Sequence, residues 1–238
     1  MENTKPLASQ VALVTGGTRG IGQAIARRLG QMGAHLAICA RNAPKLKETE
    51  RAFRAEGIEA LALPADVTRT DQVAALIEEI RTQLGPIDVL VNNAGIGAFG
   101  AFHELSEADW DRVLNTNLRA VFLVSKAVAP SMIERRTGHI INISSLAGQN
   151  TFAGAAAYCA SKWGLQGLTG CMAEDLRGYG IRVSVICPGT VHTEFSPHAG
   201  KDPGKMLQPD DVAHIVAMLV TQAPQSFASE IHLRPTHK

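Results

Sequence analysis

The sequence lacks a charge imbalance, a long apolar run and the features of an amino-terminal leader. Its 23 lysines and arginines are matched by 22 aspartates and glutamates, which leaves a formal net charge of +1. A balance this close to zero gives no reason to expect nucleic acid or an anionic membrane as the main partner. No apolar stretch approaches the roughly 18 residues of a membrane span, and the start MENTKPLASQ has neither the basic nor the apolar part of a signal peptide. We therefore expect a cytoplasmic protein with no membrane partner.

The chain is also poor in residues that form disulfides or hold metals. Its four cysteines, Cys39, Cys159, Cys171 and Cys187, are scattered and form no CxxC pair. The eight histidines show neither HxxxH nor HExxH spacing. We therefore expect reduced thiols, no disulfide and no metal site.

Short β-branched apolar runs alternate with longer stretches of helical spacing along the whole chain. Strands are expected near residues 11–16, 35–40, 60–65, 88–93, 139–144, 182–187 and 230–235. Helical spacing marks residues 21–32, 43–57, 70–85 and 161–180. Near-continuous Val, Ile and Leu in the strands imply burial on both faces, hence a parallel sheet between two helix layers. The sequence therefore predicts an α/β fold, a Rossmann-type doubly wound parallel sheet of about seven strands flanked by helices on both faces, in a single domain over residues 1–238.

A glycine-rich turn follows the first expected strand and opens the first expected helix. In TGGTRGIG, residues 15–22, Gly16, Gly20 and Gly22 would allow a tight turn, close approach of backbone to a pyrophosphate and close packing of helix on strand. The amino terminus of the helix adds free amides and about half a positive charge for the anion. Glycine clusters also mark plain loops, and the spacing here is GxxxGxG rather than GxGxxG. The strand before it and the helix after it nevertheless favour dinucleotide binding.

Two arginines favour NADP(H) over NAD(H) as the cofactor. Arg41 follows the second expected strand, where an NAD-selective site carries an acid that accepts from the adenosine 2′-hydroxyl. An arginine instead attracts a 2′-phosphate through paired, charge-assisted donors, and Arg19 in the glycine turn can reach the same group. The alternative is that one or both arginines face solvent. Asp66, after the third strand, is placed either to accept from the adenine amino group or to cap a helix.

Tyr158 and Lys162 stand four residues apart in the stretch YCASK. On a helix they would share one face, with Cβ atoms about 5 to 6 Å apart. The simplest interpretation is an amphipathic tyrosine beside a solvated lysine. The chemical alternative is that a lysine cation about 4 to 5 Å away lowers the pKa of the phenol from near 10 to about 7, where the hydroxyl exchanges protons readily.

Seven short motifs lie in register along essentially the whole chain. They are TGGTRGIG at 15–22, DV at 66–67, NNAG at 92–95, Asn117 in LNTNL, SS at 144–145, YCASK at 158–162 and PGTVHT at 188–193. Together they resemble the short-chain dehydrogenase/reductase superfamily. Within it, the general look is similar to bacterial 3-oxoacyl-acyl-carrier-protein reductases and related carbonyl reductases.

This resemblance implies roles for single residues. Tyr158 would be the catalytic acid/base, with Lys162 as its activator. Ser145 would hold the substrate oxygen, since the adjacent Ser144 fits the family spacing less well. Asn117 is similar to the family's fourth catalytic residue, which holds a water in a proton relay. The resemblance implies cofactor contacts at Gly16, Thr18, Arg19, Gly20, Ile21, Gly22, Arg41, Asp66, Val67, Asn93, Ala94, Gly95, Tyr158, Lys162, Pro188, Gly189, Val191 and Thr193.

The expected reaction is the reversible, NADPH-dependent reduction of a ketone or aldehyde to an alcohol. A carbonyl needs hydride at carbon and a proton at oxygen, and the nicotinamide supplies only the hydride. Tyr158 would supply the proton, while Ser145 donates to the oxygen as charge develops. The substrate would be a small carbonyl or alcohol compound, with a 3-oxoacyl thioester or a related ketone as a candidate. The alternatives are an NAD-linked secondary alcohol dehydrogenase and a non-catalytic NADP(H)-binding regulatory protein.

Substrate specificity is expected from loops beyond the strand ends. Residues 191–207 should cover the substrate, because such loops usually carry specificity. The rest of the pocket is expected at Gly97, Ala98, Phe99, Gln149, Thr151 and Phe152. The family resemblance further implies a homotetramer or homodimer built on the long helices.

Overall fold

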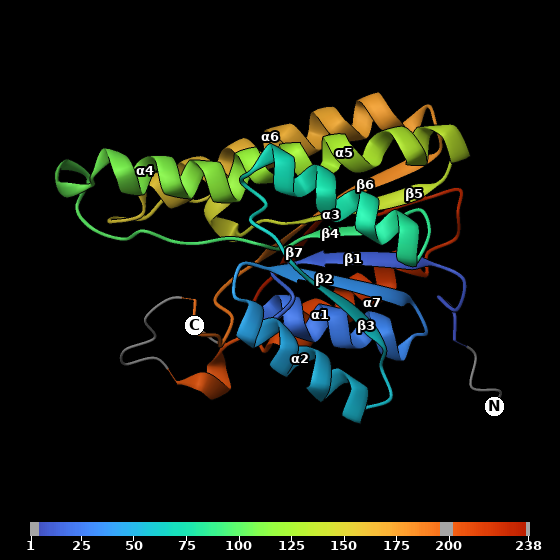
Figure 1. Cartoon of the computed structure of the whole chain (residues 1–238). Coiled ribbons are helices and arrows are strands. Elements are labelled where there is room, and N and C mark those ends of the chain that lie inside the picture. Colours follow the sequence, from blue (N-terminus) through green and yellow to red (C-terminus); the bar gives the residue numbers. More distant parts are fainter. Residues whose placement is uncertain (1–4, 196–201, 237–238) are drawn as a thin grey trace.

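A parallel sheet of seven strands forms the centre of the molecule. The computed structural model describes residues 5–195 and 202–236. The strand order is β3-β2-β1-β4-β5-β6-β7 (Figure 1). The strands are β1 (Val11–Thr15), β2 (His35–Ala40), β3 (Ala60–Pro64), β4 (Val89–Asn92), β5 (Gly138–Ile143), β6 (Ile181–Pro188) and β7 (Glu230–Leu233). All seven lie where the apolar runs predicted them, and every pairing is parallel.

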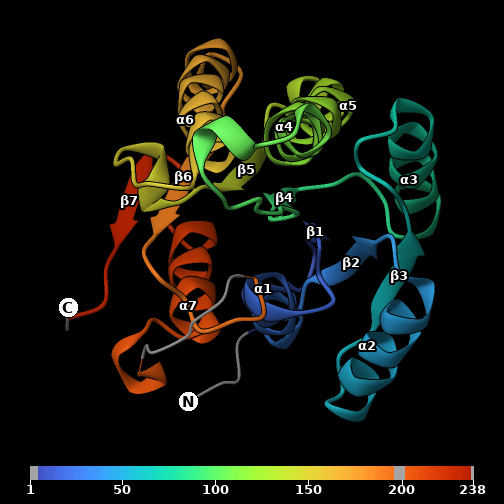
Figure 2. The ribbon, with the colours of Figure 1, turned by 90° about the vertical axis from the view of Figure 1, so that its left-hand side faces the viewer.

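Helices cover both faces of this sheet. Figure 2 shows α1, α2 and α7 on one side and α3, α4, α5 and α6 on the other. Their bounds are α1 (Gly20–Gln31), α2 (Ala43–Ala55), α3 (Thr70–Gln83), α4 (Glu107–Leu114), α5 (Ala120–Arg135), α6 (Ala156–Arg177) and α7 (Pro209–Val220), with short 3-10 turns at Phe102–Glu104, Leu146–Gly148 and Pro203–Lys205 and a π-helical turn at Asn115–Arg119. Across residues 5–195 and 202–236, every helix is too short or too polar to pass through a bilayer.

The pleat of β1 explains why its run of apolar residues is unbroken. Successive side chains in a strand point to opposite faces of the sheet. Leu13 therefore packs among Val73 of α3 and Val124 of α5, whereas Val14 packs among Ile25 of α1 and Val216 of α7. All six of these side chains are almost fully buried. Both faces of the strand are core, as the sequence pattern required.

Local sequence signals determine where several helices begin. The side chain of Asn42 accepts a hydrogen bond from the amide of Lys45 (3.0 Å) at the start of α2. Ser106 accepts in the same way from the amide of Asp109 (3.1 Å) at the start of α4. Each cap satisfies one of the amides that the first turn of a helix leaves without a partner.

The order of the strands places a crevice at the carboxyl end of β1. The chain adds β2 and then β3 on one side of β1, and continues with β4 on its other side. In doubly wound sheets this reversal opens a crevice beyond the strand ends, where ligands bind. The glycine turn after β1, Asn93 after β4, the serine pair after β5 and Pro188 at the end of β6 all belong to this edge.

Candidate active site

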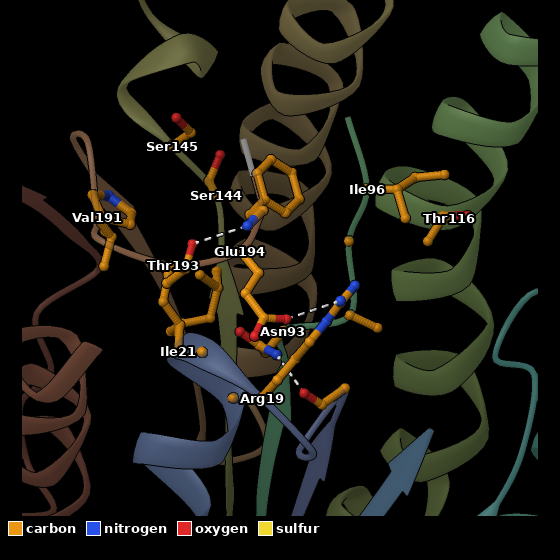
Figure 3. Close-up of a pocket in the computed structure, with 18 of the residues that line it drawn as sticks. Arg19, Ile21, Asn93, Ile96, Thr116, Ser144, Ser145, Val191, Thr193 and Glu194 are labelled. Carbon is orange, nitrogen blue, oxygen red and sulfur yellow. Dashed lines mark hydrogen bonds and ion pairs between the residues drawn. The ribbon is translucent and has the colours of Figure 1, made fainter. Parts of the chain in front are cut away.

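A cleft of about 1040 Å³ runs along the carboxyl edge of the sheet (Figure 3). Its lining includes the whole set of residues predicted to contact a cofactor: Gly16, Thr18, Arg19, Gly20, Ile21, Gly22, Arg41, Asp66, Val67, Asn93, Ala94, Gly95, Tyr158, Lys162, Pro188, Gly189, Val191 and Thr193. Ser145 lies in the same lining. The cleft thus brings together segments from six strand ends, those of β1 to β6.

The glycine turn has the close packing that its sequence predicted. Gly16 has a φ of +68°, a conformation that side chains other than glycine's rarely adopt. A Cβ added at Gly22 would lie 2.3 Å from both Asn93 Nδ2 and the carbonyl oxygen of Gly16. Without these two glycines, the turn could not lie this close to β4. The resulting cradle is open to the cleft at the amino terminus of α1.

Asn93 fixes the shape of this turn from the neighbouring strand end. Its Nδ2 donates to the carbonyls of Thr15 (3.0 Å) and Gly16 (3.2 Å). The Thr15 hydroxyl in turn accepts from the amides of Asn93 (3.0 Å) and Ala94 (3.1 Å). Asn93 therefore lines the cleft as predicted, but its side-chain amide hydrogens are used to hold β1 and β4 together.

Cationic side chains gather at the end of the cleft near β2. Arg19, Arg41 and Lys45 all line it. The sequence places an arginine, and not an acid, after β2, and the structure also brings an acidic side chain near each arginine. Glu194 pairs with Arg19 at 3.5 Å between Oε2 and Nη1, as the dashed line in Figure 3 shows. Asp66 lies close enough to Arg41 for the charge of the guanidinium to lower the pKa of the Asp66 carboxyl.

Asp66 organises the turn after β3. Its Oδ1 accepts from the amide (3.0 Å) and the hydroxyl (2.8 Å) of Thr68. Burial alone would raise the pKa of this carboxyl, but the hydrogen bonds from Thr68 and the charges of Arg41 and Arg69 lower it overall. Of the two roles left open by the sequence, helix capping is not observed, because α3 begins after Arg69 without a side-chain cap. Asp66 instead holds the turn that precedes the helix, and it faces the cleft.

Tyr158 and Lys162 lie one turn apart on α6 and both face the cleft. The lysine Nζ is 5.9 Å from the centre of the tyrosine ring and donates to the carbonyl of Ile143 (2.8 Å). Lys162 is buried, and this desolvation lowers its pKa to about 8. A solvated lysine on a helix surface is therefore excluded.

The pKa of Tyr158 shifts upward, opposite to the lowering that the sequence predicts. Desolvation raises the pKa of Tyr158, and this outweighs the lowering effect of a hydrogen bond with Ser145. Lys162 Nζ donates to the carbonyl of Ile143, and burial lowers the pKa of the lysine itself. Tyr158 is thus a protonated phenol at neutral pH, which suits it to donate a proton.

The two adjacent serines have different surroundings. Ser144 is buried and its hydroxyl donates to the carbonyl of Lys162 at 3.4 Å. The hydroxyl of Ser145 accepts from the amide of Ala147 (3.1 Å) and reaches Tyr158. The serine whose spacing from the tyrosine fits the family is also the one that contacts the tyrosine.

A family model of the short chain dehydrogenases matches residues 10–204. The chain belongs to this family. A metagenomic short-chain oxidoreductase solved in complex with NADP is 47% identical, with a TM-score of 0.87 over 98% of this chain and 99% of that one. An actinorhodin polyketide ketoreductase variant solved with NADPH is 38% identical, with a TM-score of 0.89 over 95% of both chains. The 3-oxoacyl-[acyl-carrier-protein] reductase of Pseudomonas aeruginosa is 36% identical over 225 residues, which are 90% of this chain and 91% of that protein.

In this short-chain dehydrogenase, Asn117 lies behind the cleft wall rather than in it. It is buried within the π-helical turn between α4 and α5. Its Oδ1 accepts from the amide of Ile96 (2.8 Å), and its Nδ2 donates to the carbonyl of Ile96 (2.8 Å) and to Ser161 (3.0 Å). Protein groups already bond both ends of this amide, so a water relay at Asn117 stays a prediction and would have to use its backbone.

Several residues in or behind the cleft were missed from the sequence. Ser161 stands between the tyrosine and the lysine of YCASK. Its hydroxyl accepts from Asn117 Nδ2 and donates to the carbonyl of Tyr158 (2.7 Å). Arg234 and Pro235 enter the cleft from beyond β7 and carry no local signal. Of the expected substrate-pocket residues, Phe99 and Phe152 line the cleft. Gly97, Ala98, Gln149 and Thr151 are not in its lining.

The expected substrate loop is only partly described. Val191, Thr193, Glu194 and Phe195 line the cleft, and Val191 forms a β-bridge with Leu207. Residues 196–201 lie outside the described ranges. Gln149, expected in the substrate pocket, instead bonds Glu230 and His232 on β7.

Cys187 lies beside these two β7 side chains. The potential ligand atoms of Cys187, Glu230 and His232 lie within 4.8 Å of one another. Burial raises the pKa of the Cys187 thiol to about 11, so a proton competes with any metal at neutral pH.

Proposed function

We propose that this short-chain dehydrogenase reduces a ketone or aldehyde carbonyl to an alcohol with NADPH, reversibly. The observation that carries the proposal is that Tyr158, Ser145 and buried Lys162 wall the same cleft that holds the glycine cradle and, at its far end, Arg19 and Arg41. An acid, an oxygen-binding hydroxyl and a dinucleotide cradle in one cleft are the parts that carbonyl reduction needs.

The cleft suits an NADP(H) dinucleotide on three counts. Gly16 and Gly22 leave the backbone bare where a pyrophosphate would lie at the amino terminus of α1. Arg19, Arg41 and Lys45 offer cationic donors for a 2′-phosphate. The two similar chains solved with NADP and NADPH, reported above, support the same cofactor.

The reduced nicotinamide supplies hydride when bound, and side chains of this protein supply the proton and bind the carbonyl oxygen. Tyr158 gives its proton to the carbonyl oxygen, and its raised pKa keeps that proton in place until negative charge develops on the oxygen. Ser145 donates a hydrogen bond to the same oxygen. Lys162, with a pKa of about 8, can pass a proton toward the tyrosine after each turnover. In the direction of alcohol oxidation, the same groups move the proton the other way.

The physiological substrate that we propose is a 3-oxoacyl thioester or a related ketone. The similarity to a 3-oxoacyl-[acyl-carrier-protein] reductase over 91% of that protein supports this choice. Pockets differ widely among enzymes that share this fold, so the assignment needs its own test.

The test measures loss of NADPH absorbance with purified protein and a panel of ketones, aldehydes and 3-oxoacyl thioesters, repeated with NADH. We expect turnover on at least one ketone, faster with NADPH. Faster turnover with NADH would contradict the cofactor assignment. Tight NADPH binding without turnover on any member of the panel would favour the non-catalytic binding protein instead.

A further inference from the structure

Three of the chain's seven phenylalanines lie together at the substrate end of the cleft. Phe99, Phe152 and Phe195 all line it. Their exposed fractions are 45%, 55% and 41%. They come from three separate segments, after β4, after β5 and after β6. Phenylalanine usually lies in the core, so three exposed rings in one concave site point to an apolar ligand.

The rings are arranged around the proposed proton donor. The ring centre of Tyr158 is 5.7 Å from that of Phe99 and 5.7 Å from that of Phe195, with interplanar angles of 55° and 52°. These are the tilted contacts that aromatic side chains prefer. Any group bonded to a carbonyl that accepts a proton from Tyr158 therefore lies next to these rings.

Backbone contacts hold two of the three segments in place. The amide of Gly100 donates to the carbonyl of Gly154 (2.9 Å), which joins the segment of Phe99 to that of Phe152. The Phe99 ring also lies over Gly97, where an added Cβ would come within 2.5 Å of Phe99 Cε2. The position of the Phe99 ring thus depends on a neighbour without a side chain.

The acid next to Phe195 in the sequence is engaged away from the rings. Glu194 directly precedes Phe195, but its carboxylate is directed to Arg19 in the glycine turn (Figure 3). The serine hydroxyl and the tyrosine hydroxyl remain for the carbonyl oxygen. A carbonyl-binding point surrounded by rings suits a substrate with one polar atom and a flat apolar group.

Resting on the proposed function, we infer that, among the related ketones proposed above, the site prefers those whose carbonyl carries an aryl or other flat apolar group, and that Phe99 and Phe195 determine this preference. The apolar group lies against the two rings while the carbonyl oxygen lies at Ser145 and Tyr158. In the reaction, hydride from the reduced nicotinamide forms the new C–H bond, the carbonyl π electrons move to oxygen, and the Tyr158 proton forms the O–H bond. NADPH is oxidised to NADP⁺ and the ketone is reduced to a secondary alcohol.

The experiment compares kcat/KM for acetophenone and butan-2-one, each with NADPH. In Phe99→Ala and Phe195→Ala the ratio of the two constants should fall about tenfold or more, because the aryl ring loses its stacking partners. Gly97→Ala should lower the ratio in the same direction, because its methyl group displaces the Phe99 ring. Phe102→Ala is the matched control, since Phe102 is 77% exposed and outside the cleft lining, and its ratio should not change.

A binding measurement separates recognition from turnover. Calorimetry of 1-phenylethanol binding in the presence of NADP⁺ should show weaker binding for Phe99→Ala than for Phe102→Ala. An unchanged ratio in Phe99→Ala, Phe195→Ala and Gly97→Ala, or a native protein that reduces butan-2-one but not acetophenone, overturns the inference and leaves the proposed function standing. A native protein that reduces neither ketone nor any other carbonyl overturns the proposed function itself.

Discussion

Tyr158 and Lys162 show how burial changes the chemistry of a residue pair. A lysine cation close to a phenol favours the phenolate, which is why the sequence predicted a lowered phenol pKa. In the folded protein both groups are desolvated, so the pKa of the phenol rises and that of the amine falls to about 8. Both shifts favour the uncharged forms. A protonated phenol is the form that the proposed role of Tyr158 as proton donor requires.

The clearest prediction for a single residue concerns Arg41. Replacing it by aspartate removes a candidate phosphate donor and puts a second carboxylate near Asp66. We expect kcat/KM with NADPH to fall about 10- to 100-fold, the loss of one or two charge-assisted hydrogen bonds, while the value with NADH changes far less. Steady-state kinetics with both cofactors measure this.

Arg54→Asp, on the exposed surface of α2 and outside the cleft lining, is the control. Equal losses with both cofactors would show that Arg41 does not contact the phosphate.

Among the structural elements, α6 holds the reactive group through one buried serine. Ser161 is fully buried, donates to the carbonyl of Tyr158 (2.7 Å) and accepts from Asn117 (3.0 Å). Asn117 in turn bonds Ile96 in the opposite wall of the cleft. This chain of hydrogen bonds joins the first turn of α6 to the π-helical turn and to the segment after β4.

Ser161→Ala should therefore misplace Tyr158. We expect kcat to fall about 10- to 100-fold, because small displacements of catalytic groups are costly, and stability to fall by about 1 to 3 kcal/mol for the amide left unpaired. Kinetics and urea unfolding measure the two effects. Ser125→Ala removes a comparably buried serine that accepts from Asn92 (3.0 Å), and it should cost stability without loss of kcat. Equal effects on kcat in the two variants would assign Ser161 a purely structural role.

For the whole molecule, the sequence predicted the features that depend on residue spacing. It did not predict the side-chain contacts between segments that lie far apart in the chain. The strands, the glycine turn and the i, i+4 pair on α6 follow from residue spacing. Three features join residues that lie far apart in the chain. Glu194 pairs with Arg19, Gln149 bonds His232 on β7, and Arg234 lines the cleft from beyond β7. No local pattern encodes such contacts. The homodimer or homotetramer stays a prediction, which sedimentation analysis can measure.

Stability of the sheet should fall in acid because of one histidine. His139 on β5 is almost fully buried, and its Nε2 bonds Ser184, whose hydroxyl donates to Ala228. Ser184 must then accept from His139 Nε2–H, which leaves Nδ1 as the site of protonation, and that atom has no partner among the described residues. Desolvation, followed by the charge of Arg182, lowers the pKa to about 3. Because the folded pKa lies below the ordinary value, this contribution to stability is complete above about pH 6.5 and is lost as pH falls toward 3.

Unfolding in urea at a series of pH values tests this. Between pH 6.5 and 3 the native protein should lose up to about 5 kcal/mol more stability than His139→Gln, at about 1.36 kcal/mol per pKa unit. His35→Gln, an exposed histidine on β2, should follow the native curve. Parallel curves for the native protein and His139→Gln would show that the histidine is not held neutral.

Tyr158→Phe tests the central claim most directly, because it removes one hydroxyl and keeps the ring between Phe99 and Phe195. Two quantities are measured: kcat for a ketone that the native protein reduces, and the Kd for NADPH. The proton-donor role predicts a fall in kcat of about 10²- to 10⁴-fold with nearly unchanged NADPH binding. Full turnover in this variant would contradict it.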